Sequence, residues 1–224
     1  MNRIIIIRAK VPRAGNVKTR LLPFLAPEQC RDLAEAFLLD AINKTRNLCD
    51  ELIIAFAPAH EKDYFAGVNV ENLTLIEQRG ADLGEKMFNA LEFALRRNSD
   101  ASVVIIGTDS PTFPPEFVAE AFEKLVSKAK IVLGASEDGG FYLIGLRKNL
   151  PNLFKNIEWS SPQVYEQITW NITQSGYILD SIPVWYDVDT PDDLRHLRDE
   201  ILGSKQAQKV APQTFRWLSQ NEKR

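Results

Sequence analysis

The sequence of 224 residues is poor in the residue types that build disulfide frameworks and zinc sites. It holds only two cysteines, Cys30 and Cys49, and two histidines, His60 and His196. Two cysteines cannot form a disulfide framework, and none of these residues has the close spacing of zinc ligands. Burial of the cysteines as small apolar side chains is the simpler interpretation, and it fits a reducing cytosol.

Long apolar runs are also missing. The β-branched run from Ile4 to Ile7 is too short for the core of a signal peptide. No stretch approaches the roughly 20 apolar residues that a membrane-spanning helix needs. We therefore expect a soluble, cytoplasmic protein that does not act at a membrane.

The sequence has no excess of positive charge. Lysine and arginine number 27 against 30 aspartates and glutamates, which gives a formal net charge of -3. A protein that follows a nucleic-acid backbone is usually basic, so nucleic acid is not an expected partner. A small polyanionic substrate would need a local group of cations or a bound metal ion.

Hydrophobic periodicity predicts an α/β fold. Apolar, β-branched runs predict strands at 3–8, 51–57, 73–77, 102–107, 131–135, 141–146 and 178–184. Amphipathic patterns predict helices at 27–48, 83–97, 114–128, 162–174 and 190–202. Strands that alternate with helices imply a three-layer α/β/α sandwich around a mostly parallel, mixed sheet. The short connection between the strands at 131–135 and 141–146 is either a hairpin or a chain that leaves the main sheet and returns.

The chain length corresponds to one domain, which we place at residues 1–202. The segment 203–224 is polar except for Phe215, Trp217 and Leu218. We expect it to be a loosely docked tail with a short helix.

A cationic loop follows the first predicted strand. It contains Lys10, Arg13, Lys18 and Arg20, and Gly15 permits a turn that brings backbone amides near a ligand. An arginine offers a planar fork to a phosphate and a lysine offers a point charge. An ordinary solvated basic loop explains the same composition equally well.

Carboxylates and glycines follow three later strands, at the sheet edge where ligands of open α/β sheets bind. These residues are Asp109, Asp138, Gly139, Gly140, Asp187 and Asp189. If Asp187 or Asp189 meets Asp109, the two carboxylates would hold Mg²⁺ or Mn²⁺ against a diphosphate. Taken one at a time, the segments are also common turn sequences.

In this order the clusters resemble a bacterial family of GT-A-like glycosyltransferases, formerly a domain of unknown function. The resemblance extends to about Leu202. The matching stretches are 12–21, 80–87, 106–111, 137–145, 159–162 and 187–194. The family is similar in fold to nucleotidyltransferases such as phospholactate guanylyltransferase and the molybdenum-cofactor nucleotidyltransferases. It usually has threonine where Ser161 stands here.

The resemblance implies a GT-A fold and gives roles to the donor-side residues. Lys18 and Arg20 would bind the phosphates, Asp109 would be the main metal ligand, and Asp189 would be the second. The motif here is Thr-Asp-Ser rather than the Asp-x-Asp of many sugar transferases, so the second carboxylate must come from elsewhere in the chain. Gly80 and Gly84 would let the base or ribose of a nucleotide approach.

The remaining matched residues lie on the expected acceptor side. Asp138 is a candidate for contacting the sugar or for acting as general base. Ser160 and Ser161 would line this side together with Gly139 and Gly140. The neighbouring Trp159 is better explained by structural packing.

The leading hypothesis is a glycosyltransferase that uses a nucleotide sugar, with a divalent cation, Mg²⁺ or Mn²⁺, binding the diphosphate. The alternative is a nucleotidyltransferase that joins a nucleoside triphosphate to a phosphorylated small molecule and releases pyrophosphate. Both use the same fold, the same cation and a small-molecule acceptor. A third hypothesis is a nucleotide-binding module without turnover, because a fold does not guarantee an activity.

Overall fold

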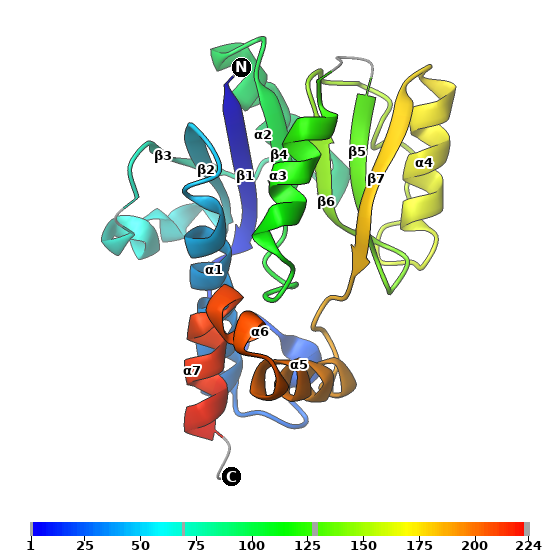
Figure 1. Cartoon of the computed structure of the whole chain (residues 1–224). Coiled ribbons are helices and arrows are strands. Elements are labelled where there is room, and N and C mark those ends of the chain that lie inside the picture. Colours follow the sequence, from blue (N-terminus) through cyan, green and yellow to red (C-terminus); the bar gives the residue numbers. More distant parts are fainter. Residues whose placement is uncertain (1, 69, 127–129, 222–224) are drawn as a thin grey trace.

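The protein is built around a sheet of seven strands. A computed structural model describes residues 2–68, 70–126 and 130–221 (Figure 1). The strands are β1 (Arg3–Lys10), β2 (Glu51–Ala57), β3 (Leu73–Glu77), β4 (Ser102–Ile106), β5 (Lys130–Ser136), β6 (Phe141–Leu146) and β7 (Ile178–Trp185). Their order in the sheet is β3-β2-β1-β4-β6-β5-β7, and only β6 runs opposite to its neighbours. The predicted mostly parallel, mixed sheet is confirmed.

Seven α-helices and two 3-10 helices are found among the described residues. The helices are α1 (Pro27–Thr45), α2 (Leu83–Arg97), α3 (Pro115–Lys124), α4 (Val164–Gln174), α5 (Pro191–Gly203), α6 (Lys205–Val210), α7 (Pro212–Asn221), η1 (Thr19–Leu21) and η2 (Ala59–Gly67). The helix predicted to reach residue 48 ends at Thr45, because the amide of Leu48 turns back to the Thr45 carbonyl at 2.9 Å. The predicted end of the third helix, 127–128, lies outside the described residues.

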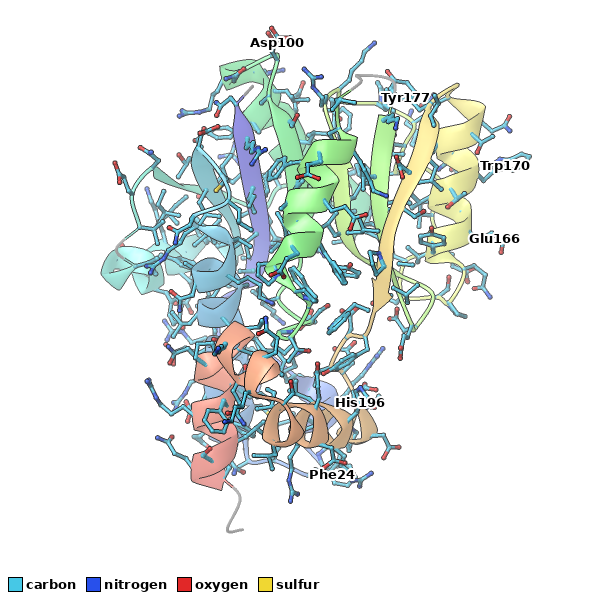
Figure 2. All side chains as sticks on the ribbon, viewed as in Figure 1. Phe24, Asp100, Glu166, Trp170, Tyr177 and His196 are labelled. Atoms are coloured by element: carbon cyan, nitrogen blue, oxygen red, sulfur yellow. The ribbon has the colours of Figure 1, made fainter. Side chains whose placement is uncertain are left out.

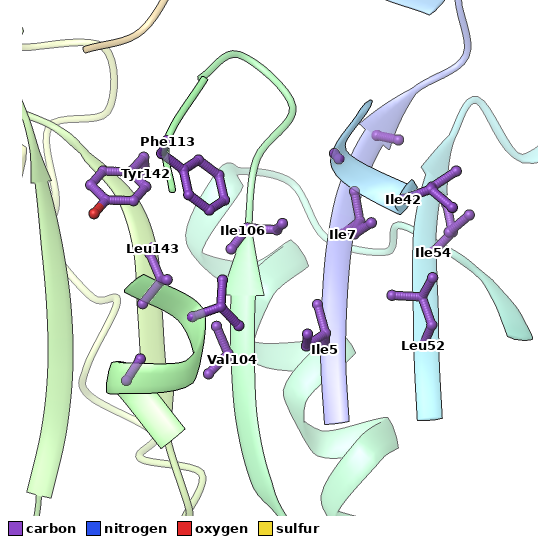
Figure 3. Packing of buried hydrophobic residues seen from close by; sticks show 14 of the residues in the cluster. Ile5, Ile7, Ile42, Leu52, Ile54, Val104, Ile106, Phe113, Tyr142 and Leu143 are labelled. Atoms are coloured by element: carbon purple, nitrogen blue, oxygen red, sulfur yellow. The ribbon is translucent and has the colours of Figure 1, made fainter. Parts of the chain in front are cut away.

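Side chains alternate between two hydrophobic cores along β1. Ile5 and Ile7 pack with the inner faces of α1 and α3, and Ile4 and Ile6 pack with α2 and α4. Figure 3 shows the first of these cores. All four isoleucines are completely buried, and burying each one stabilises the fold by roughly 1.5–3 kcal/mol. Both faces of the sheet are covered, which confirms the three-layer sandwich.

The connection after β5 is a hairpin. The chain turns at residues 137–140, and β6 then inserts between β4 and β5. The turn passes close to another loop, because a Cβ on Gly139 would lie 2.1 Å from the Pro162 carbonyl oxygen. Gly139 also has a left-handed φ of 87°, so a larger residue would strain the turn. The hairpin brings Asp138 to the end of the sheet where β1 and β4 finish.

The segment after Gly203 is packed more firmly than the sequence predicts. Helices α5, α6 and α7 gather beyond one end of the sheet, in the lower part of Figure 1. Trp217 and Leu218 enter a third core with Phe37 of α1. The buried carboxylate of Asp40 accepts hydrogen bonds from the Gln213 and Thr214 amides, both at 2.9 Å. This buried carboxylate on α1 therefore caps α7, a long-range contact that local sequence patterns do not reveal.

No helix within the described ranges combines the length and the apolar character that a bilayer crossing needs.

Replacing Asp40 with alanine is expected to lower the free energy of unfolding by about 2 kcal/mol, because buried amides and the Thr214 hydroxyl lose their acceptor. Urea unfolding measures the change. Asn43→Ala, on the exposed side of the same helix, is the matched control and should stay within about 0.5 kcal/mol of the wild type. An Asp40→Ala protein as stable as the control would contradict the proposed capping role.

Candidate functional site

The ammonium group of Lys18 joins segments from the beginning, middle and end of the chain. It donates hydrogen bonds to Asp109 Oδ1 and, at 2.7 Å, to the Val188 carbonyl oxygen, and it lies 3.6 Å from Asp189 Oδ1. The Lys18 side chain is only 6% exposed. Burial alone lowers its pKa, but Asp109 and Asp189 outweigh burial, so the pKa of Lys18 is raised. Lys18 therefore stays charged at the centre of the site.

The backbone holds these groups in place. Lys18 adopts a left-handed conformation with φ 49°, at the start of η1. The amide of Val188 donates to the Asp109 carbonyl oxygen at 2.9 Å, which ties the segment after β7 to the segment after β4. The Lys18 ammonium also lies 5.0 Å from the centre of the Phe37 ring. The meeting of Asp109 with Asp189 through Lys18 agrees with the sequence prediction that these segments converge.

Asp187 is a third carboxylate of this cluster, and two serine hydroxyls hold it. Its two oxygens accept hydrogen bonds from the hydroxyls of Ser110 and, at 2.6 Å, Ser136. Burial is the main reason that the pKa of Asp187 is raised to about 6, and the charges of Asp109 and Asp138 act in the same direction. Asp187 is costly to ionise because it is buried and lies near the negative charges of Asp109 and Asp138. A cation bound beside these carboxylates would lower that cost.

Arg20 lies on the solvent side of this cluster. Its guanidinium is 3.4 Å from Asp189 Oδ2, and its side chain is 67% exposed. Asp189 precedes the N-terminus of α5, where Thr190 and Asp193 form a capping box. The helix predicted to start at residue 190 begins at Pro191, directly after the Thr190 cap. The cap fixes the backbone that carries Asp187 and Asp189.

Two cavities meet at this cluster. The first has a volume of about 370 Å³ and is lined by Lys10, Lys18, Gln78 and Asp109 among others. The second has a volume of about 350 Å³ and is lined by Asp138, Gly140, Ser160, Ser161 and Asp187 among others. Arg8, Arg20 and Asp189 line both cavities. A reacting pair of molecules in the two cavities would therefore meet beside two arginines and the carboxylates.

The predicted cationic loop divides between the first cavity and other contacts. Lys10 lines the cavity, and its ammonium donates to the Asn16 carbonyl oxygen at 2.5 Å. Arg13 instead pairs with Glu61 of η2, with Nε 2.9 Å from Oε1. Gly15 has the expected left-handed backbone, with φ 79°, but it does not line either cavity. The structure thus brings Lys10, Lys18 and Arg20 to the cavities and leaves Arg13 outside them.

Gly80 and Gly84 also lie outside the linings of the two cavities. Gly84 is required for packing, because a Cβ there would lie 2.7 Å from Phe154 and 2.8 Å from Trp159. Gly80 has φ 136°, which disfavours any other residue. Asp82 caps α2 by accepting a hydrogen bond from the Glu85 amide at 2.8 Å. Nucleotide contact at these two glycines stays a prediction.

The predicted acceptor residues gather around the second cavity. Asp138 accepts a hydrogen bond from the Gly140 amide at 2.9 Å, and both residues line the cavity. Ser160 and Ser161 lie on the opposite segment, where Ser160 has a left-handed φ of 68°. Gly139 supports the turn and is not among the lining residues.

Arg8 is a residue that the sequence prediction missed. It interrupts the apolar run of β1 two residues before the strand ends, and its guanidinium reaches over Gly107, where a Cβ would lie 3.8 Å from Nη2. A charged side chain inside a buried strand was the available signal. Gln78 was also missed: its side-chain amide donates to the Ala9 and Ala55 carbonyl oxygens at 3.0 and 2.8 Å.

The two histidines lie elsewhere. His196 of α5, labelled in Figure 2, packs edge-on against Tyr186 with 4.5 Å between ring centres. Cys30 is buried, as expected, and Cys49 is half-buried. Neither histidine lines the two cavities.

The carboxylates provide the donor atoms that a divalent cation prefers. No group of three or more histidine, cysteine, aspartate or glutamate side chains forms a ready metal site within the described residues. Asp109 and Asp189 are instead drawn to Lys18, and Asp187 is close enough to Asp109 for their charges to interact. The carboxylate oxygens that line the two cavities are the type of ligand that Mg²⁺ and Mn²⁺ prefer.

With a metal chelator present, the free energy of unfolding of Asp187→Asn is expected to rise relative to that of the wild type as the pH rises. The folded-state pKa of Asp187, about 6, lies above its ordinary value, so its favourable contribution is complete only at low pH and is lost as the pH rises through 6. With allowance for partial exposure, the gain at pH 7.5 is about 1 kcal/mol. Thermal unfolding from pH 4 to 8 measures it, with the exposed Asp63→Asn as control. A difference independent of pH would contradict the burial of this charge.

Comparisons with known proteins identify the family of the chain. The sequence pattern of a family described as "Uncharacterized protein conserved in bacteria (DUF2064)" matches residues 39–161, more than half of the chain. The chain belongs to this family. The resemblance predicted from the sequence motifs is thereby confirmed.

Two proteins named 2-phospho-L-lactate guanylyltransferase are similar along most of their length. The protein from Methanosphaera stadtmanae is 24% identical over 196 residues, covering 87% of this chain and 83% of the relative. The protein from Haloarcula marismortui is 26% identical over 191 residues, covering 84% and 83%.

Solved structures confirm the GT-A fold. A candidate nucleotide-diphospho-sugar transferase from Desulfovibrio desulfuricans G20 is 29% identical, with a TM-score of 0.89 over 99% of this chain and 96% of that one. A nucleotidyl transferase from Methanothermobacter is 13% identical, with a TM-score of 0.57 over 90% and 98% of the two chains, and it shows the fold alone. The predicted enzyme class, a transferase, agrees with the named relatives, of which the two sequence relatives are nucleotidyltransferases.

Proposed function

We propose that the chain is a nucleotidyltransferase that joins a nucleoside triphosphate to an anionic, phosphorylated small molecule and releases pyrophosphate. The observation that carries the proposal is the meeting of two cavities at Arg8, Arg20 and Asp189, beside Lys18 and two further carboxylates. The relatives named as guanylyltransferases support it. Residues 1–202 are the proposed catalytic domain.

The first cavity is the proposed donor site. Lys18 and Arg20 would exchange their present carboxylate partners for phosphate oxygens, and Lys10 would add charge at the far side. A planar arginine fork and a lysine point charge are the side chains that phosphates bind most readily. Leaving pyrophosphate carries developing negative charge, which these cations would stabilise.

Asp109, Asp187 and Asp189 are the proposed ligands of a divalent cation, Mg²⁺ or Mn²⁺. When bound, the cation would supply charge neutralisation and orientation for the phosphates. Lys18 and the cation would then share Asp109 and Asp189 as partners. Without the cation, the Lys18 ammonium neutralises part of the negative charge of these carboxylates. The serine hydroxyls of Ser110 and Ser136 hold Asp187 in position.

The second cavity is the proposed acceptor site. Ser160 and Ser161 offer hydroxyls to the acceptor, and the Asp138 carboxylate faces the same space. A phosphate nucleophile is already ionised, so transfer to it needs no general base, and Asp138 would contact the acceptor instead.

A second candidate is glycosyl transfer from a nucleotide sugar, which the overall similarity to the structure from Desulfovibrio desulfuricans G20 favours. The products distinguish the two. With a phosphorylated acceptor and a nucleoside triphosphate, we expect pyrophosphate, measured by a coupled phosphate assay. Release of a nucleoside diphosphate from a nucleotide sugar would instead support the second candidate, and binding without either product would leave a non-catalytic module.

Asp109→Asn is expected to remove the metal-dependent part of nucleotide binding. A nucleoside triphosphate at about 100 times its dissociation constant should stabilise the wild type by about 2.7 kcal/mol. Thermal shifts with and without Mn²⁺ measure this, with Asp63→Asn, on the exposed side of η2, as control. A wild type that responds to no nucleotide in the presence of metal would contradict the proposed function, and an unchanged Asp109→Asn would contradict the ligand role.

A further inference from the structure

Arg8 occupies an unusual position for a charged residue. It lies near the carboxyl end of β1, directly after four completely buried isoleucines, and its own side chain is half-buried. Burial lowers its pKa, while Asp109 and Asp187 act in the opposite direction. An arginine remains charged under all physiological conditions, so the fold keeps a fixed positive charge in a partly buried place.

The guanidinium of Arg8 is not committed to a protein partner. Among the residues that the structure describes, the Arg8 side chain makes no hydrogen bond and no ion pair within 4 Å. The other two cations of the cluster are committed: Lys18 binds Asp109 and the Val188 carbonyl, and Arg20 pairs with Asp189. The guanidinium donors of Arg8 therefore remain available to a ligand in the two cavities that Arg8 lines.

Arg8 also lies at the border between the two cavities. Its Nη2 is placed over Gly107, directly before the segment that carries Asp109, and the side chain lines both the proposed donor and acceptor cavities. The cations that line the second cavity are Arg8 and Arg20. Because Arg20 is paired with Asp189, an anionic group in the second cavity would form its hydrogen bonds with the Arg8 guanidinium.

We propose that Arg8 holds an anionic oxygen group of the acceptor beside the donor phosphates, and so selects a phosphate over a neutral hydroxyl as nucleophile. This inference rests on the proposed nucleotidyl transfer. An oxygen of the acceptor phosphate attacks the α-phosphorus of the nucleoside triphosphate and forms a new phosphoanhydride bond. The bond from the α-phosphorus to the oxygen that bridges to the β-phosphorus breaks, and pyrophosphate leaves with the electron pair.

The charges and the shape of the guanidinium explain why a phosphate would be preferred. Before any ligand binds, Arg8, Lys18 and Arg20 balance Asp109, Asp187 and Asp189, so the cluster gives no net attraction to two anionic substrates. A divalent cation would offset the donor, and the uncommitted guanidinium would offset the acceptor. A bidentate fork recognises a phosphate but gains little from a single hydroxyl.

The test uses inorganic phosphate as a probe of the acceptor cavity. Calorimetry measures its binding to the full chain with Mg²⁺ and a saturating non-hydrolysable nucleoside triphosphate, which keeps phosphate out of the donor cavity. We expect Arg8→Gln to weaken phosphate binding by about tenfold or more, and Arg8→Lys by about threefold, since lysine keeps the charge without the fork. Because Arg8 also lines the donor cavity, nucleotide affinity should fall as well, but by clearly less than phosphate affinity, at most about threefold.

Arg96→Gln removes an arginine from the exposed face of α2 and is the matched control, with phosphate binding like the wild type. In turnover, Arg8→Gln should raise the KM for a phosphorylated acceptor by a larger factor than the KM for the nucleotide. Equal phosphate affinity in Arg8→Gln and the wild type would overturn the inference, as would equal losses for phosphate and nucleotide.

Failure of the proposed function gives a different result. A wild type that binds no nucleotide contradicts nucleotidyl transfer, whereas phosphate titration of the wild type and Arg8→Gln without nucleotide still reports on the Arg8 site. A wild type that uses hydroxyl acceptors as efficiently as phosphorylated ones would overturn the selection by Arg8 while leaving nucleotide binding intact.

Discussion

The buried ammonium of Lys18 is the contact on which the site depends. It donates hydrogen bonds to Asp109 and Val188, which lie 91 and 170 residues after Lys18 in the sequence. The side chain that makes these contacts is almost fully shielded from solvent. Without it, Asp109, Asp187 and Asp189 would repel one another at the end of the sheet. Lys18 therefore holds together the loop after β1, the turn after β4 and the segment that leads into α5. These three segments contribute residues to the lining of the two cavities.

The fold was predictable because its strands follow simple rules. A run such as Ile4 to Ile7 is fully apolar because successive side chains enter different cores, one under α1 and α3 and the other under α2 and α4. The convergence of Lys18, Asp109 and Asp189 was predictable because parallel strands end at the same edge. The hairpin between residues 135 and 141 was not predictable. Turn residues such as Gly139 and Gly140 fit a hairpin as well as a chain that leaves the main sheet and returns.

What local patterns did not reveal depends on contacts distant in sequence. The firm packing of α7 arises from Asp40, which looks like an ordinary polar residue of α1 until the Gln213 and Thr214 amides are placed against it. Arg13 looked equivalent to Lys18 in the loop, yet Glu61 of η2 holds it outside the cavities. Arg8 was overlooked because a strand was expected to contribute packing, whereas the Arg8 side chain near the end of β1 lines both cavities.

The position of β7 at the edge of the sheet has a consequence for how the protein matures. Because Val188 and Asp189 follow this last strand, a chain emerging from the ribosome lacks two of the groups that Lys18 contacts until residues 188 and 189 have been made. The strand pairs β1–β2, β2–β3 and β5–β6 precede these residues in the sequence, so their pairing does not depend on a completed site. A ligand that needs Val188 and Asp189 could therefore bind only after β7 and the segment behind it have been made.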